Sequence, residues 1–329
     1  MKICDLCFND EEMQLTVRNE SIGIGICEAC GKESSIIDAD VFSGFFNELL
    51  GCFVPSEEGT DVVHLIQKDW NVFVDIDVAR KIVSYYLDQS DFCYTIDERV
   101  DYMDDVLDYI NIWEQLKQQV MEKSRFFTSL ESFDKMRLIQ WNMSIPVGTK
   151  LYRARVIPPD KEKLCIEEMG CPPAKITPAG RANPLGIPYL YLCQDEETTF
   201  YEVRALYLDK LGVGTFNVNR NLKLFDFTKE VSLYVASTMS DNFVNAISKF
   251  KLIQRISSDL SKPLRRYDTE LEYVPTQLIC EYCKLNGIDG IRFESSLHEG
   301  GQNVVLFDTN DADCIDVAVK EIQSVTIRC

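Results

Sequence analysis

The sequence reads Gly180-Arg181-Ala182-Asn183-Pro184-Leu185-Gly186-Ile187-Pro188-Tyr189-Leu190-Tyr191-Leu192 where a long irregular segment gives way to an apolar strand. Prolines recur through residues 158–188, and long loops of this kind are often functional. Residues 188–193 then have the apolar and aromatic side chains of a strand, and residues 196–206 follow with a helical pattern. This succession predicts a domain of mixed α/β content in the C-terminal half of the chain.

The same alternation of strand and helix patterns extends in both directions from this stretch. Helices are predicted at residues 241–260 and 275–285, and Gly287 is suited to end the second of them. The domain is expected to span residues 145–329. Further strands are predicted at residues 149–156, 213–218, 222–227, 288–293, 303–308 and 324–327.

Four polar residues stand inside these apolar patterns, namely Arg153, Tyr191, Glu202 and Ser295. Taken singly, Tyr191 would be an ordinary strand aromatic, Glu202 a solvated helix carboxylate and Ser295 a turn residue, just as Arg181 would be a loop charge. Taken together, they supply a bidentate cation, an aromatic ring with a hydroxyl, a carboxylate and a second hydroxyl. That set suits an anionic, ring-bearing ligand on whose sugar positive charge develops, such as NAD.

The N-terminus contains two Cys-x2-Cys pairs, Cys4 with Cys7 and Cys27 with Cys30, and Gly31 follows the second pair. Four thiolates at this spacing are typical of a structural, tetrahedral zinc site. The residues between the pairs have a hairpin-like pattern, so residues 1–37 are predicted to form a zinc ribbon. The alternative is two unrelated pairs of free cysteines. A third pair, Cys280 and Cys283, falls on a predicted helix, where core packing is expected instead.

Residues 38–144 are predicted to form an acidic helical domain. Apolar residues recur at three- and four-residue spacing over residues 41–50 and 76–87, and a single long helix is predicted from about residue 97 to residue 127. With the zinc ribbon and the C-terminal domain, this gives an α+β protein of three parts.

Charge and composition exclude several classes of function. The chain of 329 residues has a net charge of −19, and residues 1–140 contain 12 Lys+Arg against 28 Asp+Glu. Such an acidic half would repel a phosphate backbone, so no nucleic-acid partner is expected. No apolar run approaches the length of a membrane span, and thirteen cysteines without a signal region favour a reducing cytoplasm. Only two histidines, His64 and His298, leave little scope for histidine-based catalysis, although an accessory role of His298 stays open.

The polar residues of the C-terminal half belong to an ordered series of motifs that resembles the RES domain, a family named for its Arg, Glu and Ser. The resemblance covers about residues 145–310. The motifs are Leu151-Tyr152-Arg153, residues 180–192 as quoted above, Thr198-x3-Glu202-Val203-Arg204, Tyr273-x2-Thr276-Gln277, Asp289-Gly290-Ile291-Arg292-Phe293-x-Ser295 and Gly301-x-Asn303-x2-Leu306-Phe307.

The resemblance implies an ADP-ribosyltransferase-like fold and a toxin-like activity that degrades NAD, with inorganic phosphate as the acceptor in some members. NAD is therefore the expected substrate, and phosphate or water the expected acceptor. Members of this kind act as toxins or phage-defence effectors, so a protein antitoxin or regulator is an expected partner. The implied catalytic residues are Arg153, Tyr191, Glu202 and Ser295, and the implied NAD contacts are Arg153, Tyr152, Arg181, Asn183, Tyr191 and Ser295.

Specific roles follow from the chemistry of these side chains. Glu202 would stabilise the positive charge that develops on the ribose, Arg153 would bind the pyrophosphate, and Arg155 or Arg181 would hold the second phosphate or the acceptor. Tyr191 would stack on the nicotinamide or ribose, and Ser295 would bond the carboxamide or ribose. Two alternatives stay open: transfer of ADP-ribose to a macromolecule, and a catalytically silent binding module.

The helical region resembles the HEPN-like extensions that precede some RES domains. Ribonucleases of the HEPN superfamily have an Arg followed by a His about six residues later, whereas the arginine nearest upstream of His64 is Arg18. This departure argues against ribonuclease activity. A recognition, oligomerisation or autoinhibitory role is expected for this region.

Overall fold

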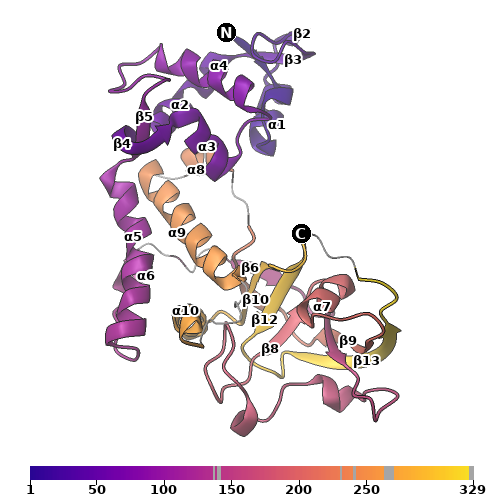
Figure 1. The fold of residues 1–329 in the computed structure, drawn as a ribbon. Coiled ribbons are helices and arrows are strands. Elements are labelled where there is room, and N and C mark those ends of the chain that lie inside the picture. The colour runs from indigo at the N-terminus through magenta and orange to yellow at the C-terminus, as the bar shows by residue number, and fades with distance from the viewer. Residues whose placement is uncertain (136–137, 139–141, 230–231, 240–241, 263–269, 326–329) are drawn as a thin grey trace. The chain divides into compact units, whose positions relative to one another are not determined.

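The computed structural model describes residues 1–135, 138, 142–229, 232–239, 242–262 and 270–325 (Figure 1). The chain forms two compact units, one of Met1–Asn111 with Glu230–Lys251 and one of Ile112–Lys229 with Leu252–Cys329. This division differs from the three consecutive parts expected from the sequence. It joins the cysteine-rich N-terminus to the helical region and adds to them a segment from the C-terminal half.

The N-terminal cysteines lie at the ends of the strands of a small antiparallel sheet of order β1-β3-β2, formed by β1 (Lys2–Cys4), β2 (Gly23–Ile26) and β3 (Glu33–Asp38), and in the turns next to them. The hairpin expected between the two cysteine pairs is wrong, because that segment contains the helix α1 (Glu11–Asn19). Asp10 caps this helix by accepting bonds from the N–H groups of Glu12 and Met13. The helix buries Met13 and Val17, which are four residues apart.

The rest of residues 38–111 combines helices with a two-stranded sheet. The helix predicted over residues 76–87 is confirmed as α4 (Ile76–Leu87). An all-helical region is wrong, however, because β4 (Phe53–Asp61) pairs with β5 (Arg99–Tyr102). The other elements here are η1 (Asp5–Cys7) before α1, then η2 (Ala39–Phe42), α2 (Ser43–Leu50) and α3 (Val62–Trp70).

Aromatic packing explains why a distant segment joins the first unit. This segment contains α8 (Leu233–Met239) and the start of α9 (Phe243–Ser261). The ring of Tyr234 packs edge-on against Phe42 and Phe45, at centroid distances of 5.2 and 5.7 Å. In addition, Lys251 forms an ion pair of 2.6 Å with Asp69. These contacts join residues almost two hundred positions apart in the sequence.

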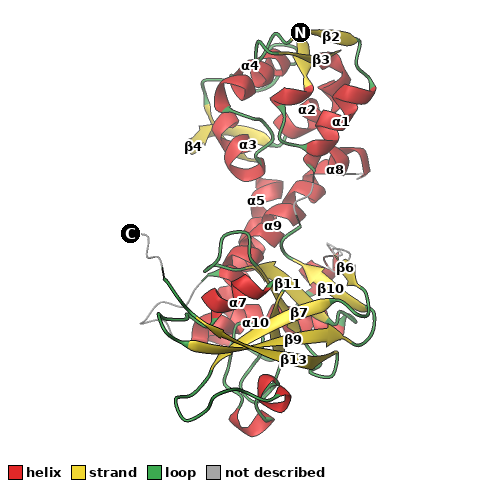
Figure 2. Ribbon diagram, turned by 90° about the vertical axis from the view of Figure 1, so that its right-hand side faces the viewer, coloured by secondary structure: helices red, strands yellow, loops and turns green. Residues whose placement is uncertain are grey.

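The second unit is built on a sheet of order β13-β9-β7-β8-β12-β11-β10-β6 (Figures 1 and 2). The α/β content expected for the domain is confirmed, whereas its strand order was not predicted; among the described strands, only β10 and β11 pair in parallel. The strands are β6 (Asn142–Ile145), β7 (Lys150–Val156), β8 (Leu190–Cys193), β9 (Lys210–Val218), β10 (Leu222–Asp226), β11 (Gly290–Glu294), β12 (Gln302–Leu306) and β13 (Ala312–Glu321).

Most strand predictions for this unit are confirmed within three residues, with two exceptions. The sequence did not indicate β6, which is only four residues long and contains as many polar as apolar residues. The last strand was predicted at residues 324–327, but β13 ends at Glu321, and residues 326 and 327 lie outside the described part. The strand β13 pairs with β9 from Ala312 to Glu321. It was not recognised in the sequence because acidic residues, including Asp313 and Asp316, interrupt the apolar pattern of a strand.

Two of the predicted helices are shorter in the structure. The long helix expected over residues 97–127 begins only at Asp104, because residues 99–102 form β5, and its regular part ends at Gln118. The helix α7 (Glu196–Glu202) stops before Arg204, which has a left-handed backbone with φ of 52°. The remaining elements are α5 (Asp104–Gln118), η3 (Gln119–Lys123), α6 (Glu131–Lys135), η5 (Ile166–Met169), η6 (Ala174–Ile176), η7 (Glu270–Tyr273) and α10 (Val274–Leu285).

The two faces of the central strands have different neighbours. Side chains alternate along a strand, so Leu151 of β7 lies on one face and Ala154 on the other. Leu151 belongs to a large apolar cluster with Leu190 and Leu192 of β8. Ala154 packs in a smaller cluster with Phe200 of α7 and with Val203, which directly follows this helix. The helix α7 therefore covers the Ala154 face of the sheet (Figure 2).

Candidate functional site

The Glu202 carboxylate is held from two strands at the end of α7. Its Oε1 atom accepts a bond of 2.7 Å from the Ser295 hydroxyl and a second bond of 2.7 Å from Nδ2 of Asn303. Within the described part of the chain, Oε2 accepts no hydrogen bond. One oxygen of this half-buried carboxylate is thus fixed by two donors, and the other is left to face a ligand.

Ser295 lies just after β11 and is 9% exposed. Its hydroxyl oxygen accepts bonds of 3.2 Å from the backbone N–H groups of Leu297 and His298. A serine hydroxyl has one proton, and here this proton is donated to Glu202. The Ser295 hydroxyl is thus directed at the carboxylate in this structure, and the expected contact to the carboxamide or ribose stays a prediction.

Asn303 is a residue of this site that sequence reasoning did not single out. It is buried in β12, donates to Glu202, and accepts a weaker bond from the Cys193 thiol at 3.3 Å. Burial, with the nearby carboxylate of Glu202, raises the pKa of Cys193, so this thiol stays protonated and able to donate. The signal in the sequence was an amide placed among the apolar residues of a strand, in the motif that begins at Gly301.

Tyr191 has its hydroxyl bonded to the loop that precedes β8. The hydroxyl donates to Oδ1 of Asn183 at 2.8 Å and accepts from the N–H of Ala182 at 3.0 Å, and burial raises its pKa. A side-chain carbon added at Gly180 would lie 2.6 Å from this hydroxyl, so the close approach of the loop requires glycine. The ring, and not the hydroxyl, is therefore the part of Tyr191 that can contact a ligand.

The other two residues predicted in this loop are also engaged. Both N–H groups of the buried Asn183 amide are donated, to the carbonyls of Pro178 and Pro184. Arg181 donates from Nη1 to the carbonyl of Leu260 at 2.9 Å. Asn183 thus holds the loop around Tyr191, whereas the guanidinium of Arg181 keeps further donors.

Two arginines lie side by side on β7. Arg153 and Arg155 share the face of Leu151, opposite the face that α7 covers. Arg155 donates from Nη2 to the carbonyl of Gly170 at 2.6 Å, and its buried Nε has no partner in the described residues. Burial and the neighbouring charge of Arg153 lower the pKa of Arg155. Among the residues that the structure describes, neither arginine is bonded to a carboxylate, and two such cations on one strand face are suited to an anion.

The structure thus places the predicted residues in two neighbouring groups. Tyr152 and Cys193 are partners where β7 meets β8, and Cys193 and Asn303 are partners where β8 meets β12. Tyr152, Tyr191 and the amide that binds Glu202 therefore share one face of the sheet. Arg153 is on the other face, and its recorded bond is a long one of 3.9 Å to the Cys171 sulfur. No described hydrogen bond joins the two groups.

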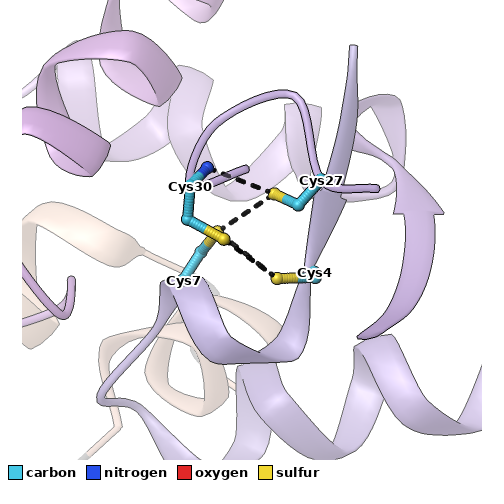
Figure 3. Close-up of side chains that lie close together, drawn as sticks. All are labelled: Cys4, Cys7, Cys27 and Cys30. Carbon is cyan, nitrogen blue, oxygen red and sulfur yellow. Dashed lines mark hydrogen bonds between the residues drawn. The ribbon is translucent and has the colours of Figure 1, made fainter. Parts of the chain in front are cut away.

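The four N-terminal cysteines converge, as the spacing predicts (Figure 3). Their sulfur atoms all lie within 4.8 Å of one another, and three of the separations are 3.4, 3.5 and 3.7 Å. Zn–S bonds of about 2.3 Å in a tetrahedron give sulfur separations of about 3.8 Å. The donor set, its burial and these separations fit a zinc ion, so the cluster can hold one.

Neighbouring groups support the cluster. The Cys27 sulfur accepts from the N–H of Cys30, and bonds from the Cys7 thiol and from backbone N–H groups lower the pKa of Cys27. Between the first two cysteines, the buried Asp5 accepts bonds of 2.7 Å from both Ser34 and Arg18. Although burial opposes ionisation, these bonds lower the pKa of Asp5. These bonds fix the turn between Cys4 and Cys7, and hydrogen bonds around metal ligands help to set the direction of the ligands.

Replacing Cys27 with serine is expected to remove zinc and to unfold the cysteine-rich sheet. A bound structural zinc contributes on the order of 10 kcal/mol to small domains, and three thiolates retain only part of this free energy. Zinc content by mass spectrometry and thermal unfolding would check the expectation. The control is Cys93→Ser, at an exposed cysteine outside the cluster. Equal zinc content in the two variants would contradict the assignment.

A hollow of about 370 Å³ lies elsewhere in the second unit. It is lined by α5, η3 and residues 127–133, including the exposed ring of Phe127. None of the residues predicted to bind NAD lines it. We therefore assign the hollow no part in the candidate site.

The second unit is an α+β domain whose mixed sheet has the Glu202 carboxylate, held by a hydroxyl and an amide, on one face and a pair of arginines on the other. A family model, described as RES domain, matches residues 150–328, which is more than half of the chain. The chain belongs to the RES domain family, and the resemblance read from its motifs is confirmed. Members of this family generally act on NAD, consistent with an NAD-related, toxin-like function.

No curated protein matches the chain. The family match covers the sheet of the second unit from β7 to the C-terminus and does not extend to the N-terminal cysteines or helices. None of the described helices is both long and apolar enough to cross a membrane.

Proposed function

We propose that this protein cleaves the nicotinamide–ribose bond of NAD and transfers the ADP-ribosyl group to phosphate or water. The observation that carries the proposal is the Glu202 carboxylate, fixed through one oxygen by Ser295 and Asn303 inside a RES domain. Two donors on Oε1 hold the plane of the carboxylate before substrate arrives, and such preorganisation favours charge stabilisation in a transition state.

The reaction needs no redox cofactor. The electron pair of the carbon–nitrogen bond leaves with nicotinamide, which becomes neutral, and positive charge develops on the ribose carbon and its ring oxygen. The ionised Glu202 stabilises that charge. An oxygen of phosphate or water then forms the new bond to the ribose carbon, and attacking water releases a proton. The rings of Tyr191 and Tyr152, on the same sheet face, supply aromatic surface to the nicotinamide or ribose.

The arginine pair of β7 supplies positive charge for the diphosphate of NAD. Replacing Arg153 with alanine is expected to raise KM for NAD about 10- to 100-fold and to change kcat by less than about threefold, because the contact is the same in ground and transition states. Steady-state kinetics would check this split. Lys150→Ala, at an exposed position of the same strand, is the matched control. A fall in kcat alone would place Arg153 at the reacting centre.

The test of the proposed function is nicotinamide release from NAD by the purified protein, with and without inorganic phosphate. Release that requires phosphate, with ADP-ribose 1-phosphate found by mass spectrometry, supports phosphorolysis. Release with free ADP-ribose supports hydrolysis. Labelled macromolecule instead of free product would show ADP-ribosyl transfer, and folded, zinc-loaded protein that neither binds nor consumes NAD would show a silent binding module.

The same activity accounts for a toxin-like role in which a protein partner restrains the enzyme. Consumption of NAD harms any cell that contains the free enzyme, so expression of the wild-type chain should arrest growth and lower cellular NAD. Expression of a variant without the Glu202 carboxylate should do neither. Co-purification with the inactive variant provides a direct way to find a restraining protein or a partner of the N-terminal unit.

A further inference from the structure

The loop between β11 and β12 is fastened to α7 by His298. Its Nδ1 lies 2.9 Å from the hydroxyl oxygen of Thr198, and its ring stacks on Tyr201 with centroids 4.4 Å apart and planes 6° apart. The other ring nitrogen, Nε2, is 3.9 Å from the exposed carboxylate of Glu197, beyond hydrogen-bond distance. His298 therefore lies against three residues of α7.

The hydrogen bonds around Thr198 determine which nitrogen of His298 carries the proton. The Thr198 hydroxyl donates its single proton to Oδ2 of Asp195 at 2.7 Å, because an ionised carboxylate can only accept. The bond between Thr198 and His298 must then be donated by Nδ1–H. Asp195 also caps α7 by accepting a bond of 2.7 Å from the N–H of Thr198. The Thr198 hydroxyl, which accepts from His298, is therefore part of the rigid start of the helix.

The contact is closely packed as well as bonded. A side-chain carbon added at Gly301 would lie 2.5 Å from the Thr198 hydroxyl and 2.8 Å from Nδ1 of His298. The loop also closes on itself, because the N–H of Gly301 donates to the carbonyl of His298 and the N–H of Ser295 donates to the carbonyl of Gly301. The backbone of the loop at Gly301 therefore packs directly against the hydrogen-bonded pair of Thr198 and His298.

We infer that His298 is a positioning residue for the Glu202 carboxylate. The chain of contacts runs from Thr198 to the His298 ring, from the His298 N–H to the Ser295 oxygen, and from the Ser295 hydroxyl to Glu202. The imidazole locks the loop on α7, and the locked loop presents two N–H groups that aim the serine hydroxyl. This inference rests on the proposed NAD cleavage and adds to it a histidine that touches no reacting atom.

Three substitutions at this position separate positioning from other roles. His298→Ala removes the donor and the ring and is expected to lower kcat for nicotinamide release about 10- to 100-fold with little change in KM, as expected for a misplaced catalytic group. His298→Asn keeps an N–H donor close to the place of Nδ1 and should recover much of kcat. His298→Gln places its donor near Nε2 and should be no better than alanine.

A matched partner variant and a control complete the series. Thr198→Val removes the acceptor at nearly constant shape, and its effect on kcat should not add to that of His298→Ala, because both break the same bond. His64→Ala, at the exposed histidine beside Asp61 in the first unit, should leave kcat unchanged. Equal kcat in wild-type protein and His298→Ala would overturn the inference.

The protonation of His298 gives a readout that does not depend on activity. The chain has two histidines, so protein labelled with ¹⁵N-histidine shows two imidazoles, and a His64 variant assigns them. At a pH where His298 is neutral, Nδ1 should carry the proton, and Thr198→Val should abolish that preference. A neutral ring with its proton on Nε2 would contradict the inference.

The two proposals fail in distinguishable ways. If the wild-type protein releases no nicotinamide although the ¹⁵N spectrum shows Nδ1–H on His298, the proposed function is wrong and the contact is structural. If the wild-type protein is active and His298→Asn is as impaired as His298→Ala, the imidazole takes part in proton transfer itself. If His298→Ala lowers the melting temperature but not kcat, the residue serves stability alone.

Discussion

Glu202→Gln is expected to reduce nicotinamide release by at least about 10³-fold while NAD affinity changes by less than about threefold. The carboxylate stabilises charge that exists only as the carbon–nitrogen bond breaks, so its loss raises the barrier without weakening the ground-state complex. A loss of this size is on the order of 4 kcal/mol of transition-state stabilisation. It is the largest effect expected from any single substitution in this protein.

Glutamine is the informative replacement because it preserves the geometry around position 202. Its carbonyl oxygen can still accept from Ser295 and Asn303, so the end of α7 stays attached to β11 and β12. Lost activity then reports on charge and not on a collapsed site. Glu197→Gln, at an exposed carboxylate on the same helix, is the control.

Single-turnover release of nicotinamide and calorimetric NAD binding would measure the two quantities separately. Near-normal turnover by Glu202→Gln would show that the carboxylate does not stabilise the transition state. Failure of this variant to bind NAD would instead show that Glu202 contacts the ground-state ligand.

Sequence reasoning placed Glu202 and Ser295 in one candidate site because both residues are parts of an ordered motif series. The structure confirms that they meet, 93 positions apart in the chain. The sequence could not show which group the Ser295 hydroxyl bonds, because the role of a hydroxyl depends on the acceptor of its one proton. The Ser295 oxygen accepts hydrogen bonds from two backbone N–H groups. These donors need no proton from the hydroxyl, which is therefore free to donate its proton to Glu202.

The convergence of the four cysteines was predictable for a different reason. Two Cys-x2-Cys pairs need only a tight turn at each pair and a sheet that joins them, and both requirements are local. What lies between the pairs was mispredicted, because Thr16 and Val17 have strand propensity while the helix there is decided by its Asp10 cap and by the burial of Met13. Tertiary burial outweighed local propensity.

The sheet face on which Arg153 lies could not be predicted from the sequence. The sequence shows that the arginine is on a strand, but the face it occupies depends on the pairing register. The register puts Leu151 in the large cluster and therefore Arg153 on that side, whereas Tyr152 is on the side of Tyr191. A single proposed NAD site therefore requires the ligand to reach both groups, which the kinetics of Arg153→Ala would test.

The second large effect is expected from Asn303→Leu, which should lower kcat about 100-fold. Leucine has nearly the shape of asparagine but offers no donor. Glu202 would keep only the bond from Ser295, and its carboxylate could then rotate out of the position that two bonds hold. Loss of one preorganised donor in a catalytic site typically costs 10²- to 10³-fold in kcat. Steady-state kinetics at saturating NAD would measure the loss, and KM should change little.

Cys193→Ala is the control for this substitution, because it removes the thiol that donates to the Asn303 oxygen without touching the donor to Glu202. Its effect on kcat should be below about threefold. Combining Asn303→Leu with Ser295→Ala should cost less than the product of the two single losses, since both donors act on one oxygen as a unit. Strictly multiplicative losses would mean that the two residues serve separate steps, and the amide would then have a contact to substrate that Glu202 does not share.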